Sequence, residues 1–141
     1  MVLVHSAATP LPIEWAAYLT ALGATLAASR ELVHVYIATD GGAPSAIQRK
    51  DLAETVERGP VSPLNHIFTT DPFVRGIVTA FGWIAKARAV AHLPGDLQRV
   101  CVEVGHSPGE VMEDFAKVEA SFQPIRMLSL MNEGFVGRKR A

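Results

Sequence analysis

The sequence predicts a single α/β domain with one layer of four to five mostly parallel strands flanked by helices. Three observations favour this fold class. The segment 32–38 is apolar, β-branched or aromatic and carries no charge, which is typical of a strand covered on both faces. The turn formers Asp40-Gly41-Gly42 end it, and an amphipathic segment follows. The same order of strand, turn and helix recurs along the chain, as in parallel α/β sheets.

In chain order, the patterns predict alternating strands and helices over the first two thirds of the sequence. Pro10 and Pro12 end the first strand, because proline cannot donate to a ladder, and later turns contain Pro-Gly or Asp-Pro pairs. The helices are predicted from apolar residues at helical spacing. The expected strands are 2–5, 32–38, 64–70 and 87–93, and the expected helices are 13–28, 45–58 and 73–86.

The last third is less regular. Residues 97–104 fit both helical spacing and strand alternation; we favour a helix, since Asp96 can cap its start and Gly105 sits where a helix ends. Ser107 and Glu110 have the spacing of a capping box that opens an extra C-terminal helix to Phe122. Residues 125–131 are expected to form a short strand or helical turn. The domain is expected to span 1–131, followed by a flexible tail at 132–141.

Composition narrows the classes of function. The chain has 141 residues, 49% hydrophobic and 19% charged, which suffices for one core. A net charge of −1 provides no basic field for nucleic acid or an anionic membrane. The single Cys101 excludes an internal disulfide and fits a reducing compartment. Since no apolar run is long enough for a membrane segment and no signal-peptide pattern opens the chain, we expect a cytoplasmic location.

The strongest candidate site lies where predicted strands end. Asp40 and Asp71 each follow a strand, so in a parallel sheet their carboxylates share one rim, beside the amino ends of the next helices. Asp is also common in turns and as a helix cap, so a structural role for both is the simpler interpretation. The residues that we assign to binding or regulation at this rim are Asp40, Gly41, Gly42, Ser45, Thr70, Asp71 and Phe73.

Catalytic and metal motifs are missing. Asp40-Gly41-Gly42 lacks the lysine or third glycine of a nucleotide-binding loop, and no nucleophile elbow is present. His5, His34, His66 and His92 each fall in a predicted strand, which could bring some of them together; separate structural histidines are the simpler expectation. We therefore expect no cofactor, no metal and no enzyme activity.

The order of elements and the pattern from Tyr36 to Ser45 resemble STAS-like domains, especially the SpoIIAA-like group of bacterial proteins. The resemblance covers about residues 2–104 and implies a mostly parallel sheet that works without a cofactor by docking to proteins. In anti-sigma factor antagonists of this family, a serine at the start of the helix after the second parallel strand is phosphorylated. Ser45 lies near this place, although the family's Asp-Ser-Ser/Thr-Gly pattern is missing.

The leading hypothesis is a non-catalytic bacterial regulatory or scaffolding module that binds a protein partner at the rim. One alternative is a homo-oligomer, such as a homodimer, joined through the 73–84 helix face or the 125–131 segment. Another is an enzyme or small-ligand binder with a pocket at the same rim, where Asp40, Asp71 and His66 supply acid–base groups. The latter requires a concave pocket with converging polar groups.

Overall fold

The computed structural model describes residues 1–81 and 88–139 and contains one sheet of four parallel strands in the order β1-β2-β3-β4. Each strand pairs in register with the next, for example Tyr36 with His66 and Phe68 with His92. The strands are β1 (Val2–His5), β2 (Val33–Thr39), β3 (Pro63–Phe68) and β4 (Arg88–His92). The helices are α1 (Pro12–Ala28), α2 (Ala46–Arg58), α3 (Pro72–Phe81), the short 3-10 helix η1 (Pro94–Asp96), α4 (Leu97–Glu103), α5 (Pro108–Ala120) and α6 (Arg126–Lys139).

The predicted fold class is confirmed, because helices flank a layer of four parallel strands within the described residues. The helical reading of 97–104 is also right, with α4 in that place and Gly105 at a φ of 78° just after it. Within the described residues, the predicted ends of strands and helices differ from the observed ones by at most two residues, as is usual for element boundaries. The last part of the predicted third helix, 82–86, and residue 87 lie outside the described residues.

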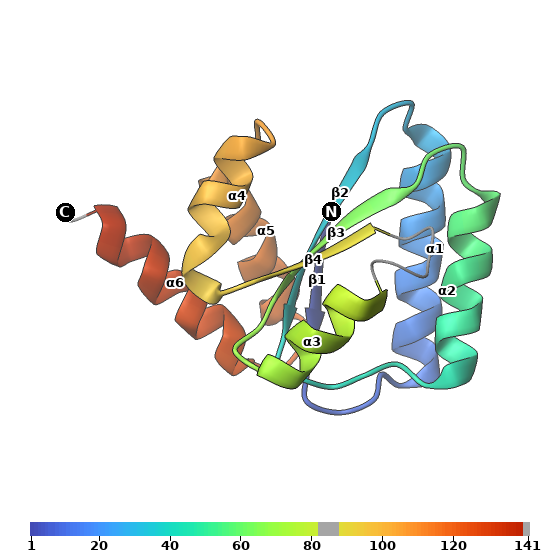
Figure 1. Cartoon of the computed structure of the whole chain (residues 1–141), viewed down its shortest axis with the longest axis horizontal. Helices are drawn as coiled ribbons and strands as arrows, with labels where there is room; N and C mark the ends of the chain where they lie inside the picture. Colours follow the sequence, from blue (N-terminus) through green and yellow to red (C-terminus); the bar gives the residue numbers. More distant parts are fainter. Residues whose placement is uncertain (82–87, 140–141) are drawn as a thin grey trace.

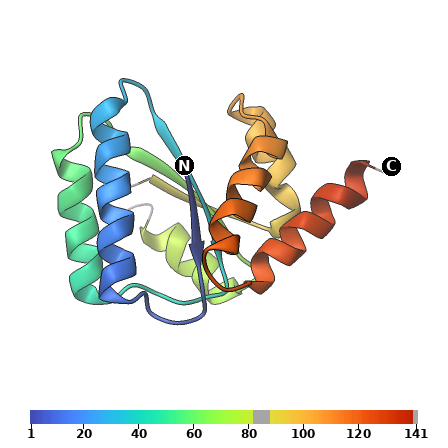
Figure 2. The same cartoon turned by 180° about the vertical axis from the view of Figure 1, so that it is seen from behind.

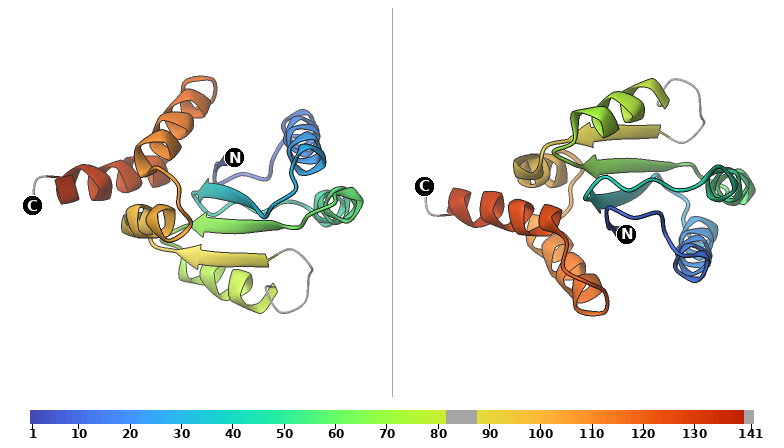
Figure 3. Two further views of the ribbon diagram at one scale, coloured as in Figure 1. Left: turned by 90° about the horizontal axis from the view of Figure 1, so that it is seen from above. Right: turned by 90° about the horizontal axis from the view of Figure 1, so that it is seen from below.

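The helices form two layers, one on each side of the sheet. The crossover helices α1 and α2 lie together on one side of the sheet, and α3 lies beside the edge strand β4 (Figure 3). The opposite side is covered by α4, α5 and α6, all of which follow the last strand (Figures 1 and 3). The chain therefore builds its sheet first and closes the second face afterwards.

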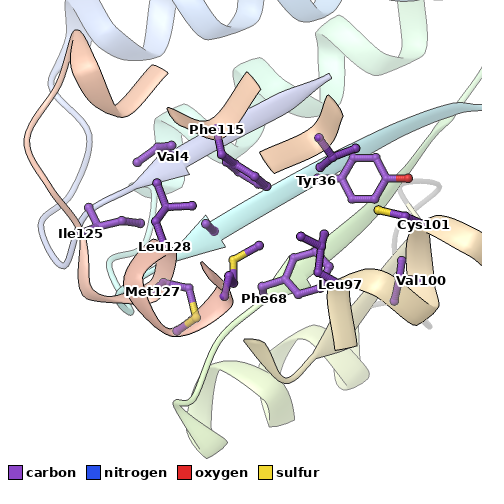
Figure 4. Packing of buried hydrophobic residues seen from close by; sticks show 13 residues of the cluster. Val4, Tyr36, Phe68, Leu97, Val100, Cys101, Phe115, Ile125, Met127 and Leu128 are labelled. Carbon is purple, nitrogen blue, oxygen red and sulfur yellow. The ribbon is translucent and has the colours of Figure 1, made fainter. Parts of the chain in front are cut away.

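A hydrophobic core fills the space between the sheet and the C-terminal helices. Tyr36 and Phe68 project from β2 and β3, and Phe115 of α5 meets them from the opposite side (Figure 4). All three are almost inaccessible to solvent. The other members of this cluster are Val4, Ala38, Leu97, Val100, Cys101, Val111, Ile125, Met127, Leu128 and Met131.

A second core lies beneath α1 and α2. The apolar stripe predicted for α1 points inward, with Leu22 and Leu26 fully buried against Val33 and Val35 of β2. Val56 brings α2 into the same cluster. Since the side chains of β2 alternate between this core and the first one, both faces of the strand are apolar, which explains its charge-free sequence.

The C-terminal tail predicted at 132–141 is wrong over the described part, because α6 runs from Arg126 to Lys139. The short strand or helical turn expected at 125–131 is the first half of this helix. Met127, Leu128 and Met131 of α6 belong to the first core. The prediction failed because glycines at 134 and 137 weaken the helical pattern, whereas burial of the first two turns supplies the stability.

Helix starts are mostly as predicted. The Ser107 hydroxyl accepts a hydrogen bond from the Glu110 N–H and caps α5. Pro72 is the first residue of α3, whereas Pro44 precedes Ser45, which is the cap of α2. None of the helices within 1–81 and 88–139 has the length and apolar character needed to cross a membrane.

Helix α6 yields a direct stability test. Met131 is fully buried, so Met131→Ala is expected to lower the free energy of unfolding by about 2–4 kcal/mol through lost contacts and a cavity. The neighbouring Asn132 is exposed, and Asn132→Ala is expected to change it by less than about 0.5 kcal/mol. Urea unfolding of both variants measures the difference; equal, small effects would mean that α6 does not pack on the sheet.

Candidate functional site

The carboxyl ends of β2 and β3 are closed by the same local structure. Thr39 and Thr69 are both buried, and the hydroxyl of each accepts a hydrogen bond from the amide two residues later, at 3.1 Å. The equivalent threonines are thus 39 and 69, whereas Thr70, assigned to the rim from the sequence, is exposed. These turns bring the Asp40–Gly42 loop and Asp71 to one rim, as predicted.

The Asp40 carboxylate caps helix α6. Its two oxygens accept hydrogen bonds from the backbone N–H groups of Arg126 at 2.9 Å and Met127 at 2.8 Å. A carboxylate at this position satisfies otherwise unpaired amides and interacts favourably with the helix dipole. Asp40 therefore joins two parts of the chain 86 residues apart, which sequence spacing did not reveal.

Both glycines after Asp40 have backbone reasons to be glycine. Gly41 has a φ of 107°, which favours glycine, and a Cβ there would lie 3.4 Å from the Asp71 carboxylate. A Cβ on Gly42 would collide with the carbonyl oxygens of Ser6 and Ala8. The Asp-Gly-Gly turn thus lets the loop after β1 pack closely against the end of β2.

Ser45 and Asp71 cap the next two helices. Ser45 and Gln48 form a capping box at α2, in which the serine Oγ accepts from the Gln48 N–H and the Gln48 Oε1 accepts from the Ser45 N–H. The Asp71 Oδ1 accepts from the Phe73 N–H at 2.8 Å at the start of α3. The structural interpretation offered for Asp71 is therefore confirmed, and the Ser45 side chain remains exposed at the surface.

Three large apolar side chains stand exposed at the same rim. Ile13, Ile47 and Phe73 occupy the second position of α1, α2 and α3, and they are 78%, 74% and 73% exposed. All three helices begin at the edge where the strands end (Figure 1). Leu11, the cap residue of α1, is 59% exposed beside Ile13. We call Leu11, Ile13, Ile47 and Phe73 the rim patch.

A hydrogen bond joins the α1 and α2 parts of the rim patch. The Gln48 side-chain amide in the first turn of α2 donates to the Pro10 carbonyl just before α1, at 2.8 Å. Sequence reasoning found Phe73 but missed Ile13 and Ile47. The signal that could have found them is the recurrence of a bulky apolar residue at the second helical position, where side chains point away from the sheet.

A second polar feature, absent from the predicted site, crosses the sheet diagonally from the amino end of β2 to the carboxyl end of β4. His34 Nδ1 lies 3.0 Å from His66 Nε2, and His66 Nδ1 lies 3.1 Å from His92 Nε2. The expectation of separate structural histidines is therefore wrong. We call His34, His66 and His92 the histidine row.

The register explains the histidine row. His34 pairs with Leu64 and His66 with Val90, so each histidine lies two residues further along its strand than its neighbour and projects from the same face. His5 pairs with Thr39 on the opposite face, where its Nδ1 contacts the threonine hydroxyl at 3.2 Å. The sequence indicated the strands but not the register, which determines the face.

The rings in the row meet edge to edge. Their centroids are 5.3 Å apart, whereas the nearest nitrogens are only 3.0–3.1 Å apart, which is hydrogen-bond distance. Each neutral imidazole has one donor and one acceptor nitrogen, so the tautomers of the three rings are coupled. His66, at the centre, is buried, and its two ring nitrogens both contact histidine.

A tyrosine and an exposed histidine lie beside the row. The Tyr36 hydroxyl is 2.7 Å from His106 Nδ1, and the His106 ring lies 5.3 Å from that of His34. Burial, and then the neighbouring Cys101, raise the pKa of Tyr36, so its hydroxyl stays protonated. Burial likewise raises the pKa of the Cys101 thiol, which is therefore a poor nucleophile.

The histidine row is neutral at pH 7. Burial, and then the neighbouring His92 and His34, lower the pKa of His66 from 6.5 to about 4, because a second positive charge beside either histidine is unfavourable. Burial also lowers the pKa values of His34 and His92. Neutral, mutually bonded imidazoles satisfy one another, so the row can stabilise the buried face without a ligand.

The side chains proposed for acid–base chemistry do not converge. Asp40 and Asp71 cap helices at the rim, while both nitrogens of His66 are engaged in the middle of the sheet. Within the part of the chain that the structure describes, no group of three or more His, Cys, Asp or Glu side chains is arranged to hold a metal ion.

Comparison of the chain with protein-family models, with curated proteins and with solved structures gives no match.

The role of Asp40 can be measured. Asp40→Ala removes both acceptors at the α6 amino end and is expected to lower the free energy of unfolding by about 1–2 kcal/mol. Hydrogen exchange at the Arg126 and Met127 amides is expected to become faster. Asp114→Ala, at a carboxylate that pairs with Lys117 on the surface, is the matched control and is expected to have little effect. Unchanged exchange at Arg126 and Met127 in Asp40→Ala would rule out the cap.

The histidine row predicts loss of stability in acid. The unfolded chain binds the His66 proton near pH 6.5 and the folded chain only near pH 4, so stability is complete above about pH 6.5 and falls towards pH 4. We expect His66 to account for about 2 kcal/mol, since solvent near the half-exposed His34 and His92 screens the added charge. Denaturant unfolding from pH 7.5 to pH 4.5 should show a flatter profile for His66→Phe than for the wild type. Parallel profiles would contradict this assignment.

Proposed function

We propose that this protein is a non-catalytic regulatory or scaffolding module that binds a protein partner through the rim patch. The observation that carries the proposal is the exposure of Ile13, Ile47 and Phe73 at equivalent positions of three helices that begin at one rim. Leaving several large apolar side chains in water is unfavourable, and grouped exposed apolar residues tend to mark contact surfaces.

The surroundings of the patch suit a protein surface better than a small molecule. The two carboxylates at the rim already accept helix amides, so they are not available to orient a small polar ligand. The exposed Thr70 and Ser45 lie close to the patch in the chain and supply uncharged polar groups around it. An apolar centre with a polar margin is the usual anatomy of a protein interface.

The finer parts of the proposal come from the resemblance to anti-sigma factor antagonists. We propose a bacterial, cytoplasmic protein whose docking is regulated at Ser45, which is exposed and lies two residues before Ile47. A phosphate there adds a large negative charge beside an apolar contact residue and disfavours docking. Gly41 and Gly42 contribute by shaping the loop that precedes Ser45.

A homo-oligomer is the second candidate, and it would use the same patch. The 125–131 segment is not available for it, because Ile125, Met127, Leu128 and Met131 are buried within the chain. On α3, Phe73 and Ile77 are exposed while Val78 is buried; the residues 82–84 of the predicted contact face lie outside the described part. Self-association through Phe73 and its neighbours is therefore the remaining form of this alternative.

The test compares a rim variant with a matched surface variant. The triple variant Ile13→Asp, Ile47→Asp, Phe73→Asp replaces exposed side chains only, so it is expected to fold. Val102→Asp, at a 66% exposed position on α4, is the control. In quantitative affinity purification from the native cells, we expect the triple variant to recover at least tenfold less of a specific partner than the wild type and the control.

Two results would contradict the proposal. Equal recovery of every bound protein by the wild type and the triple variant would exclude the rim patch as the docking surface. A wild-type dimer that the triple substitution converts to a monomer in sedimentation experiments would show that the patch binds a second copy.

A further inference from the structure

A groove runs along the outer edge of β1, and its lining reaches the α1 end of the rim patch at Pro10 and Glu14. It has a volume of about 320 Å³ and is lined by every residue of the strand. One wall is formed by Trp15 and Tyr18 of α1, and the other by Val118 of α5 and Phe122, which follows it. Figure 2 shows β1 between α1 and α5. The groove is therefore a channel with an apolar wall on each side and a strand as its floor.

The backbone of β1 is paired on one side only. The Met1 and His5 carbonyls accept hydrogen bonds from the Tyr36 and Asp40 N–H groups of β2 and its end, at 2.9 and 3.1 Å. Since successive residues of a strand alternate in direction, the N–H and C=O groups of Val2 and Val4 face away from β2. Because β1 is the edge of the sheet, these groups have no strand partner among the described residues.

The edge strand β1 is short, with four residues, but it lacks the sequence features that block further pairing. Exposed edges normally carry proline, lysine or a bulge that prevents further pairing, whereas Val2–His5 contains none of them. Val2 and Val4 are alternate residues of a strand, and such residues are about 6.6 Å apart. Alternate residues of a second strand have the same spacing. The backbone of β1 is therefore matched to another extended chain.

Buried polar atoms in the groove also lack partners. The Trp15 side chain is only 7% exposed, yet its indole N–H has no hydrogen-bond acceptor within the described residues. The same holds for Nε2 of His5, whose other ring nitrogen contacts Thr39. Since a buried tryptophan N–H is usually bonded, the Trp15 wall of the groove has a donor whose acceptor is missing among the described residues.

The groove favours an uncharged ligand. Glu14 is its one acidic lining residue, and its carboxylate accepts a hydrogen bond from the Leu11 N–H at 2.8 Å. Burial raises the pKa of Tyr18 to about 12 and lowers that of His5, so both are neutral at pH 7. Among the described residues, no lysine or arginine lines the groove to attract an anion.

We propose that this groove binds an extended, mainly apolar peptide segment of a partner protein, which adds to the sheet beside β1. The main chain of the peptide pairs with Val2 and Val4, and its side chains contact alternately the α1 and α5 walls. A peptide carbonyl or side-chain oxygen is the acceptor that the Trp15 N–H lacks. This recognition mode uses backbone pairing for affinity and the walls for specificity. The proposal rests on β1 and the two groove walls, and none of the four rim-patch residues lines the groove.

A random ten-residue peptide library displayed on phage tests the proposal with the whole protein as bait. We expect selected peptides with alternating apolar residues that bind at least tenfold more weakly to Val2→Pro, which removes an outward N–H at the first residue of an edge strand. Phe122→Arg, which blocks the groove without changing the strand, is expected to weaken binding equally. Val102→Arg, on the exposed side of α4, should bind as the wild type does.

Two further measurements identify the binding mode. The selected peptide is N-methylated either at its odd-numbered or at its even-numbered amides. One of these two sets is expected to abolish binding and the other to leave it unchanged, because only one edge of the peptide strand pairs with β1. The Trp15 indole N–H resonance, assigned with Trp15→Phe, should shift on binding.

Other outcomes overturn the proposal. The proposal fails if no selected peptide binds the wild type more tightly than Phe122→Arg. It also fails if methylation of the odd-numbered amides and methylation of the even-numbered amides both leave peptide binding unchanged. A protein dimer that Val2→Pro and Phe122→Arg both dissociate would show that the groove is occupied by a second copy.

Discussion

The structure depends on one topological constraint: every strand is parallel to its neighbour and the strands follow one another in chain order. Each connection must therefore return from the carboxyl end of one strand to the amino end of the next, and a right-handed helix on one side of the sheet is the solution. The first three helices begin at one rim, which aligns their first turns. The same constraint leaves the other face of the sheet bare until the last third of the chain covers it.

Covering that face requires a link between distant parts of the sequence, and Asp40 supplies it. The residue ends β2 and caps α6, so the turn that terminates the central strand also positions the C-terminal helix. The cluster around Tyr36, Phe68 and Phe115 then forms between the sheet and α4–α6. The sequence allowed two interpretations of Asp40, a surface contact and a structural cap. Its hydrogen bonds to the first amides of α6 support the structural cap.

The sequence predicted what depends on local patterns. Charge-free segments identified the first three strands, helical spacing identified α1 and α2, and Asp96, Gly105 and Ser107 identified the breaks around α4 and α5. It could not predict α6, because glycines obscure a helix that buried side chains stabilise. Nor could it predict the histidine row, since a shift of one residue in strand register would move His66 to the opposite face. At the rim it located Asp40, Asp71 and Phe73, but Ile13 and Ile47 gain meaning only when three helix starts are seen side by side.

The arrangement of helix starts also has an electrostatic consequence. The amino ends of α1, α2, α3 and α6 gather at the rim, and each carries the equivalent of about half a positive charge. Three of them have a carboxylate in the cap or first turn: Glu14 at α1, Asp71 at α3 and Asp40 at α6. Helix α2 is capped by the neutral Ser45 and has no acidic residue in its first turn. Of these four helices, α2 therefore has a positive amino end without a carboxylate beside it. A negative group on Ser45 would lie next to this amino end and interact favourably with the helix dipole.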